Sequence, residues 1–191
     1  MKDYNDIRSM SEKWDFREFV EMLPNNGFLL EIGSFLGKSA VCWAKTFKEQ
    51  EKIWDIHTVD VFEGIIDPRK MSDMHFDSEE DRESFIYYMD QFVMTGEDQL
   101  KEFQENISGW KNITWQKKYV DGDYSPPKKP DAMFYDGGHT YDNMKTIFDI
   151  LGDIPFIFVD DCTDRFPETL QVVKELGRPF EIKNGIGIIC G

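Results

Sequence analysis

The sequence predicts an α/β protein with a doubly wound, mostly parallel sheet and helices on both of its faces. Three observations lead to this fold class. Short apolar runs alternate along the chain with longer stretches whose apolar residues recur at helical spacing. The first apolar run ends in a glycine-containing turn, and the pair Asn184-Gly185 predicts a closing hairpin. An alternating order of strands and helices favours right-handed crossovers between parallel strands.

Apolar runs and chain-breaking residues mark the bounds of the expected strands and helices. Pro24 to Gly27 ends a first helix and leads into a continuous apolar run, which is typical of a strand buried on both faces. The expected strands cover residues 27–32, 54–59, 112–117, 131–135, 156–159, 180–183 and 186–190. The expected helices cover residues 15–23, 38–48, 78–93, 97–107, 141–151 and 168–176.

The composition fits one domain over residues 1–191. The formal net charge of −15 repels phosphate backbones and anionic membranes, so we expect neither nucleic acid nor a membrane as a partner. The three cysteines are far apart, which predicts reduced and mostly buried thiols. The first eleven residues are polar, and no segment has the length of a membrane span, so we expect a cytoplasmic protein. The sequence leaves a homo-oligomer open.

The segment from Phe62 to Ile107 is long for a crossover and is rich in methionine, aromatic and acidic residues. One interpretation is a helical insertion that acts as a lid and excludes water from a ligand. The other is a helical layer packed on the sheet, which the spacing of Phe85, Met89 and Phe92 favours. Residues 69–76 are the expected mobile part.

The turn after the first strand, Glu31 to Ser39, has the features of a ligand-binding loop. Gly33 and Gly37 let the backbone approach a ligand, and the helix that follows offers unpaired N–H groups. Asp60 ends the second strand, where it can accept hydrogen bonds from ribose hydroxyls. A plain tight turn is the alternative. A degenerate P-loop NTPase is disfavoured because three residues, not four, separate the glycine from the GKS motif.

Polar residues also follow two later strands. Asp136, Gly137-Gly138 and His139 follow one of them, and Asp160 and Asp161 follow the next. Each could by itself be a cap or a surface residue. Three carboxylates at adjacent strand ends would repel one another unless a hard cation such as Mg²⁺ lay between them. Their joint occurrence with an imidazole that can accept a proton near neutral pH favours a site.

Together these motifs resemble the class I S-adenosylmethionine-dependent methyltransferases. Within that class they are similar to the macrocin-type, metal-dependent sugar O-methyltransferases. The resemblance covers roughly residues 27–190 and rests on the motifs Glu31–Ser39, Asp60, Asp136–Tyr141 and Asp160-Asp161. It implies a Rossmann-like sheet of seven strands with the last strand antiparallel, which fits the hairpin at Asn184-Gly185.

The resemblance also implies residue roles. The methionine part of S-adenosylmethionine would lie near Glu31, the ribose near Asp60, and the adenine near Tyr119. The implied cofactor-binding set is Glu31, Gly33, Ser34, Gly37, Ser39, Asp60, Tyr119 and Asp136. The implied Mg²⁺ ligands are Asp136, Asp160 and Asp161, and the implied catalytic residues are Asp136 and the general base His139.

We therefore expect a divalent-metal-assisted O-methyltransferase that acts on a small-molecule or sugar hydroxyl. A regulatory module that binds a nucleotide or S-adenosylmethionine without methyl transfer remains open. Such a module would use Glu31 and Asp60, but it would have no use for three clustered acids.

Overall fold

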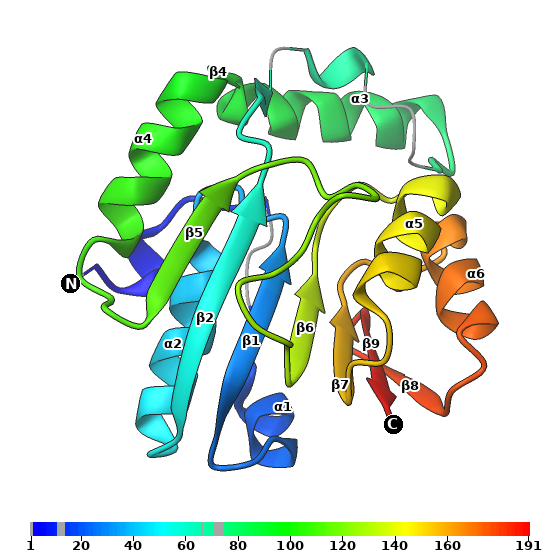
Figure 1. Ribbon diagram of the computed structural model, residues 1–191. Coiled ribbons are helices and arrows are strands. Elements are labelled where there is room, and N and C mark those ends of the chain that lie inside the picture. Colours follow the sequence, from blue (N-terminus) through cyan, green and yellow to red (C-terminus); the bar gives the residue numbers. More distant parts are fainter. Residues whose placement is uncertain (1, 11–13, 66, 71–74) are drawn as a thin grey trace.

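The computed structural model describes residues 2–10, 14–65, 67–70 and 75–191 (Figure 1). Its centre is a seven-stranded sheet in the order β5-β2-β1-β6-β7-β9-β8. Within the sheet β9 alone runs against its neighbours, as predicted. The strands are β1 (Asn26–Ile32), β2 (Ile53–Asp60), β5 (Ile113–Lys117), β6 (Ala132–Tyr135), β7 (Phe156–Val159), β8 (Phe180–Lys183) and β9 (Ile186–Cys190).

Helices cover both faces of this sheet, again as predicted (Figure 1). One face carries α1 (Arg17–Met22), α2 (Lys38–Glu49) and α4 (Gly96–Ile107), together with the short 3₁₀ helix η1 (Tyr4–Asp6). The other face carries α5 (Tyr141–Leu151) and α6 (Pro167–Glu175). The hairpin between β8 and β9 turns on Asn184 and Gly185, whose φ angles of 53° and 81° are the positive values that such a two-residue turn requires.

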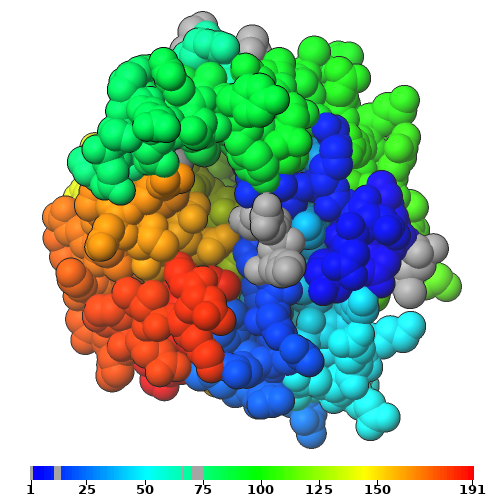
Figure 2. All heavy atoms as spheres, turned by 180° about the vertical axis from the view of Figure 1, so that it is seen from behind, coloured from blue at the N-terminus to red at the C-terminus, as the bar shows by residue number. Residues whose placement is uncertain are grey.

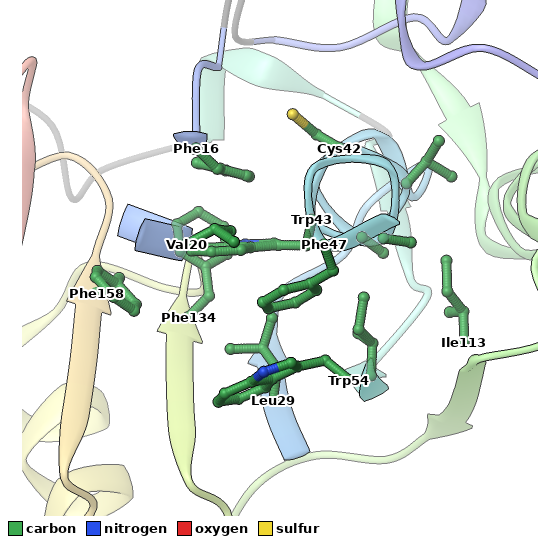
Figure 3. Packing of buried hydrophobic residues seen from close by; sticks show 14 of the residues in the cluster. Phe16, Val20, Leu29, Cys42, Trp43, Phe47, Trp54, Ile113, Phe134 and Phe158 are labelled. Atoms are coloured by element: carbon green, nitrogen blue, oxygen red, sulfur yellow. The ribbon is translucent and has the colours of Figure 1, made fainter. Parts of the chain in front are cut away.

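Aromatic residues dominate the core on the α1/α2 face. Trp43 of α2 stacks on Phe16 with the ring centroids 4.1 Å apart and meets Phe134 of β6 at 5.8 Å (Figure 3). In β1, Leu29 packs into this core and its neighbour Leu30 into the core on the opposite face. Successive side chains of a strand point to opposite faces, so both faces need apolar residues, which explains the continuous apolar run.

In the segment from 62 to 107, the part around α3 (Glu79–Met89) lies across the carboxyl ends of the strands, whereas α4 packs beside the sheet (Figure 1). Two short strands, β3 (Gly64–Ile65) and β4 (Met94–Thr95), pair antiparallel at the base of the segment. Between them lie η2 (Pro68–Lys70), α3 and η3 (Asp90–Phe92). The helix expected over 78–93 therefore ends early, at Met89, where the chain tightens into η3. Of the expected mobile part, residues 71–74 lie outside the described residues.

The three cysteines are free thiols, as predicted, with Cys42 and Cys162 buried and Cys190 partly buried. Among the described residues, no helix combines the length and the apolar character needed to cross a lipid bilayer.

Candidate active site

A cavity of about 660 Å³ opens at the carboxyl ends of the central strands. After β1 the chain continues toward β2 and β5, whereas β6 leads to β7 on the other side. Ligands of α/β sheets bind at such a switch point, and the volume suits a small-molecule site. The loop after β1 and the loop after β6 touch at this point. A Cβ on Gly33, which has φ +82°, would lie 2.0 Å from the carbonyl oxygen of Asp136, so no larger residue fits.

The glycine turn is anchored by the side chain of Asp60. Its Oδ2 accepts hydrogen bonds from the backbone N–H groups of Ser34 and Phe35, each at 2.9 Å. Its Oδ1 accepts a third from the N–H of Phe62 at 2.7 Å. One carboxylate thus fixes the turn after β1 and the start of the insertion, while Asp60 still contributes to the cavity wall.

The predicted cofactor-binding residues fall into two groups. Five line the cavity: Gly33, Ser34, Asp60, Tyr119 and Asp136. Three are not among its described lining residues: Glu31, Gly37 and Ser39. Gly37 instead begins α2 beside the side chains of Phe103 and Ile107, and Ser39 is buried. The glycine turn therefore contributes Gly33 and Ser34 to the cavity wall, whereas Gly37 packs against α4.

Glu31 lies beneath the turn and is fully buried. Among the described residues, neither of its carboxylate oxygens has a hydrogen-bond partner. Burial raises its pKa to about 8. Glu31 is therefore predominantly protonated at neutral pH.

Tyr119 stands at the rim of the cavity beyond the end of β5. Its hydroxyl donates a hydrogen bond to Oδ1 of Asn143 at 3.2 Å, and its side chain remains largely exposed. Lys118 and Val120 line the same end of the cavity. An aromatic ring at this position can pack against a flat ligand group such as a purine.

At the other end of the cavity, Asp136, His139 and Asp161 come together. Each offers one ligand atom within 4.8 Å of the other two. Nε2 of His139 lies 3.1 Å from Oδ2 of Asp161, and the imidazole packs on Phe166 with the ring centroids 4.2 Å apart. The turn after β6 and the turn after β7 thus converge on one cluster, which we call the acid–imidazole cluster.

The carboxyl groups at this end disfavour one another's ionisation. Burial, followed by the charges of Asp160 and Asp161, raises the pKa of Asp136 well above its usual range. Burial, followed by the charge of Asp161, raises the pKa of Asp160 to about 6. Acids in this situation either keep a proton or require a nearby cation.

Asp160 accepts hydrogen bonds from two donors. Its Oδ1 accepts the backbone N–H of Asp161 at 2.9 Å, and its Oδ2 accepts the indole N–H of Trp14 at 3.3 Å. The structure therefore groups His139, rather than Asp160, with Asp136 and Asp161. Sequence reasoning did not identify Trp14, which also lines the cavity. No local pattern marks it, because its partner lies 146 positions away in the chain.

The insertion and the N-terminal residues close the cavity from outside. Asp81 at the start of α3 pairs with Arg165 of the loop after β7, with an N–O distance of 2.8 Å. Tyr88 of α3 donates its hydroxyl to the carbonyl of Ser9 at 3.2 Å. Seen from behind, the green atoms of the insertion lie above the orange atoms of the 160s and beside the blue N-terminal atoms (Figure 2). We call the insertion the cap.

Comparison with known proteins identifies the family. A family described as a methyltransferase domain matches residues 30–161, which is more than half of the chain. The solved structure of the O-methyltransferase NovP is similar with a TM-score of 0.59 and 16% identity, over 92% of this chain and 77% of NovP. The SAH-bound Podospora anserina methyltransferase PaMTH1 is similar with a TM-score of 0.50 and 13% identity, over 86% of this chain and 72% of PaMTH1. No curated protein matches in sequence. The chain belongs to the methyltransferase domain family and has the fold of the class I S-adenosylmethionine-dependent methyltransferases.

Proposed function

We propose that this protein transfers the methyl group of S-adenosylmethionine to a hydroxyl oxygen of a small molecule or sugar, assisted by Mg²⁺. The observation that carries this proposal is the acid–imidazole cluster of Asp136, His139 and Asp161, which faces the same cavity as the glycine turn. A module that only binds its ligand would need the turn but not the cluster. The fold shared with NovP, an O-methyltransferase, supports oxygen as the acceptor atom.

The cavity has the features that S-adenosylmethionine requires. The hydroxyl of Ser34 is buried without a hydrogen-bond partner among the described residues, and Ser34 belongs to the cavity wall. Such a hydroxyl can bind a polar group of the ligand at little cost. When bound, S-adenosylmethionine supplies a methyl group on a positively charged sulfur. The task left to the turn and to Tyr119 is to hold the ligand so that acceptor oxygen, methyl and sulfur align.

The cluster likewise fits a divalent cation. Asp136 and Asp161 would hold the ion, because their oxygens are close together and their mutual repulsion is relieved by a positive charge. Oxygen ligands in a partly open site suit Mg²⁺, which keeps several of its waters. When bound, the ion lowers the pKa of an acceptor hydroxyl.

His139 would accept the proton of that hydroxyl. Phe166 holds the imidazole ring in place, and Asp161 lies close enough to stabilise the imidazolium that forms. The cap over the cavity would keep water away from the reacting groups. The proposal thus assigns the two ends of the cavity to separate tasks, one for the cofactor and one for the acceptor.

Titration calorimetry with S-adenosylmethionine, with and without Mg²⁺, tests the first part of the proposal. We expect cofactor binding in both conditions, and its absence at millimolar cofactor would overturn the proposal. A screen of catechols and sugars, with S-adenosylhomocysteine release as the readout, tests the second part. Turnover should require Mg²⁺ and stop in chelator. Cofactor binding without transfer to any acceptor would favour the regulatory module.

A further inference from the structure

The side chain of Gln99 joins the glycine turn to the base of the cap. Gln99 lies on α4, where it is buried and borders the cavity. Its Oε1 accepts the backbone N–H of Gly64 in β3 at 2.8 Å, and its Nε2 donates to the backbone carbonyl of Phe35 at 3.3 Å. One partner is a donor and the other an acceptor, so together they fix the orientation of the amide.

Phe35 needs this support because of its backbone conformation. Its φ of 43° lies in the left-handed region that residues other than glycine rarely adopt. Its N–H is bound by Oδ2 of Asp60 at 2.9 Å, and its carbonyl is bound by Gln99. Such a conformation persists only where the surrounding structure holds it. Gly33 and Ser34, which line the cavity, directly precede it, so the shape of this wall depends on Asp60 and Gln99 together.

The same two side chains also hold the start of the cap. Asp60 binds the N–H of Phe62, which is a second residue in the left-handed region, with a φ of 47°. Gln99 binds the N–H of Gly64, where a Cβ would lie 2.2 Å from the carbonyl oxygen of Met94. Asp60 and Gln99 therefore each contact both the glycine turn and the cap, and neither part can shift without breaking a bond to the other.

We propose that Gln99 is a positioning residue for the cofactor, whose amide sets the shape of the glycine turn through the Phe35 carbonyl and ties that shape to the base of the cap. This inference rests on the proposed function, since it concerns the same cofactor site. It adds a residue of the insertion to a set that the sequence resemblance confines to the turn and the strand ends. Without the amide, only part of the protein would have the turn in its binding shape, and cofactor affinity would fall by that fraction.

Calorimetry with S-adenosylhomocysteine, in the absence of Mg²⁺, tests the inference at the glycine end alone. Gln99→Leu keeps most of the side-chain volume but leaves the Phe35 carbonyl and the Gly64 N–H unpaired. We expect this variant to bind about 10-fold more weakly than the unaltered protein. The control is Gln104→Leu, a change at an exposed position of the same helix. Unaltered affinity in a Gln99→Leu protein that circular dichroism shows to be folded would overturn the inference.

Gln99→Glu separates the hydrogen bond from packing. Burial keeps the introduced carboxyl protonated at pH 5, so it can accept from Gly64 and donate to the Phe35 carbonyl as the amide does. Affinity relative to the unaltered protein at the same pH should then stay within about threefold at pH 5 and fall about 10-fold by pH 9, when a carboxylate faces the carbonyl. This ratio cancels the titration of Glu31 and of the acid end, which both proteins share. Binding as weak at pH 5 as in Gln99→Leu would overturn the inference, because an O–H donor would then have failed to replace the amide.

Failure of the inference can be told apart from failure of the proposed function. If the unaltered protein binds no S-adenosylhomocysteine, the proposed function fails and this inference fails with it. If the unaltered protein and Gln99→Leu bind it equally well, this inference alone fails and the proposed function stands.

Discussion

The two ends of the cavity are built by different means. At the glycine end, the Asp60 carboxylate accepts three backbone N–H groups and fixes the turn after β1. At the acid end, carboxyl groups that raise one another's pKa are held by side chains from distant segments, such as Trp14. Backbone N–H groups thus neutralise the carboxylate of the first end, whereas the carboxyl groups of the second end raise one another's pKa. A preorganised end suits cofactor binding, and an end that requires a cation suits the chemical step.

Asp161→Asn should have the largest effect and should act at the acid end alone. It removes a charged ligand and the partner of His139, so we expect kcat/KM to fall by about 10³-fold or more. S-adenosylmethionine affinity should change by less than about threefold, because the glycine end is untouched. Methyl transfer and calorimetry on the same protein measure both. The control is Asp164→Asn, an exposed acid three residues away. A parallel loss of cofactor binding would show that the two ends are not independent.

Glu31→Gln examines the fully buried acid at the glycine end. Its pKa of about 8 in the folded protein lies above the usual value of 4.5, so the folded protein keeps a proton that the unfolded chain releases. Stability should therefore fall as the pH rises from about 4.5 to 8. Glutamine mimics the protonated acid and should restore about 4 kcal/mol at pH 8 and little at pH 4.5.

Urea unfolding of the Glu31→Gln variant at several pH values measures this effect. Glu105→Gln, a change at an exposed acid of α4, serves as the control and should leave the pH dependence as it is. An unchanged slope in Glu31→Gln would mean that Glu31 is ionised in the folded protein. The glycine end would then carry a buried charge, and the contrast with the acid end would weaken.

Asp60→Asn should weaken cofactor binding at the glycine end. An amide has one acceptor oxygen and no charge, so it cannot replace a carboxylate that accepts three backbone N–H groups. Hydrogen bonds to charged groups contribute about 1.5–3 kcal/mol each, so the loss of one predicts about 10- to 100-fold weaker S-adenosylmethionine binding. Calorimetry measures this loss, and Asp55→Asn, exposed on the same strand, is the control. Unaltered affinity would show that other contacts hold the turn.

Most of the fold followed from the sequence because its signals are local. The helix at 141–151 and the strands at 156–159, 180–183 and 186–190 have the predicted bounds, since breakers flank each apolar pattern. The pairing of β3 with β4 was not predicted. Two residues per strand give no recognisable period, and their pairing depends on chain positions about thirty apart.

The site was predictable as a set of strand ends but not as a set of side-chain directions. Parallel strands bring Asp60, Asp136 and Asp161 to one edge, which the order of elements implies. Whether an acid at that edge faces the cavity depends on tertiary contacts. Asp160 accepts the indole N–H of Trp14, and Glu31 is fully buried beneath the turn. Neither feature can be recognised from the local sequence pattern.

Asp81→Asn should have the smallest effect, and it tests whether the cap moves over both ends. The Asp81–Arg165 pair is partly exposed, and such pairs contribute about 0.2–1 kcal/mol. If the cap opens as a lid, the variant should be cleaved within residues 62–107 about two- to fivefold faster, because the open state becomes more populated. Saturating S-adenosylhomocysteine should restore slow cleavage.

Glu79→Gln is the control for this prediction. It removes the ion pair of Glu79 with Arg82, which lies within α3 and does not reach the loop after β7. This variant should be cleaved at the same rate as the unaltered protein. If neither Asp81→Asn nor the ligand changed the rate of cleavage, the cap would be a static helical layer. The cap would then exclude water from the cavity at all times.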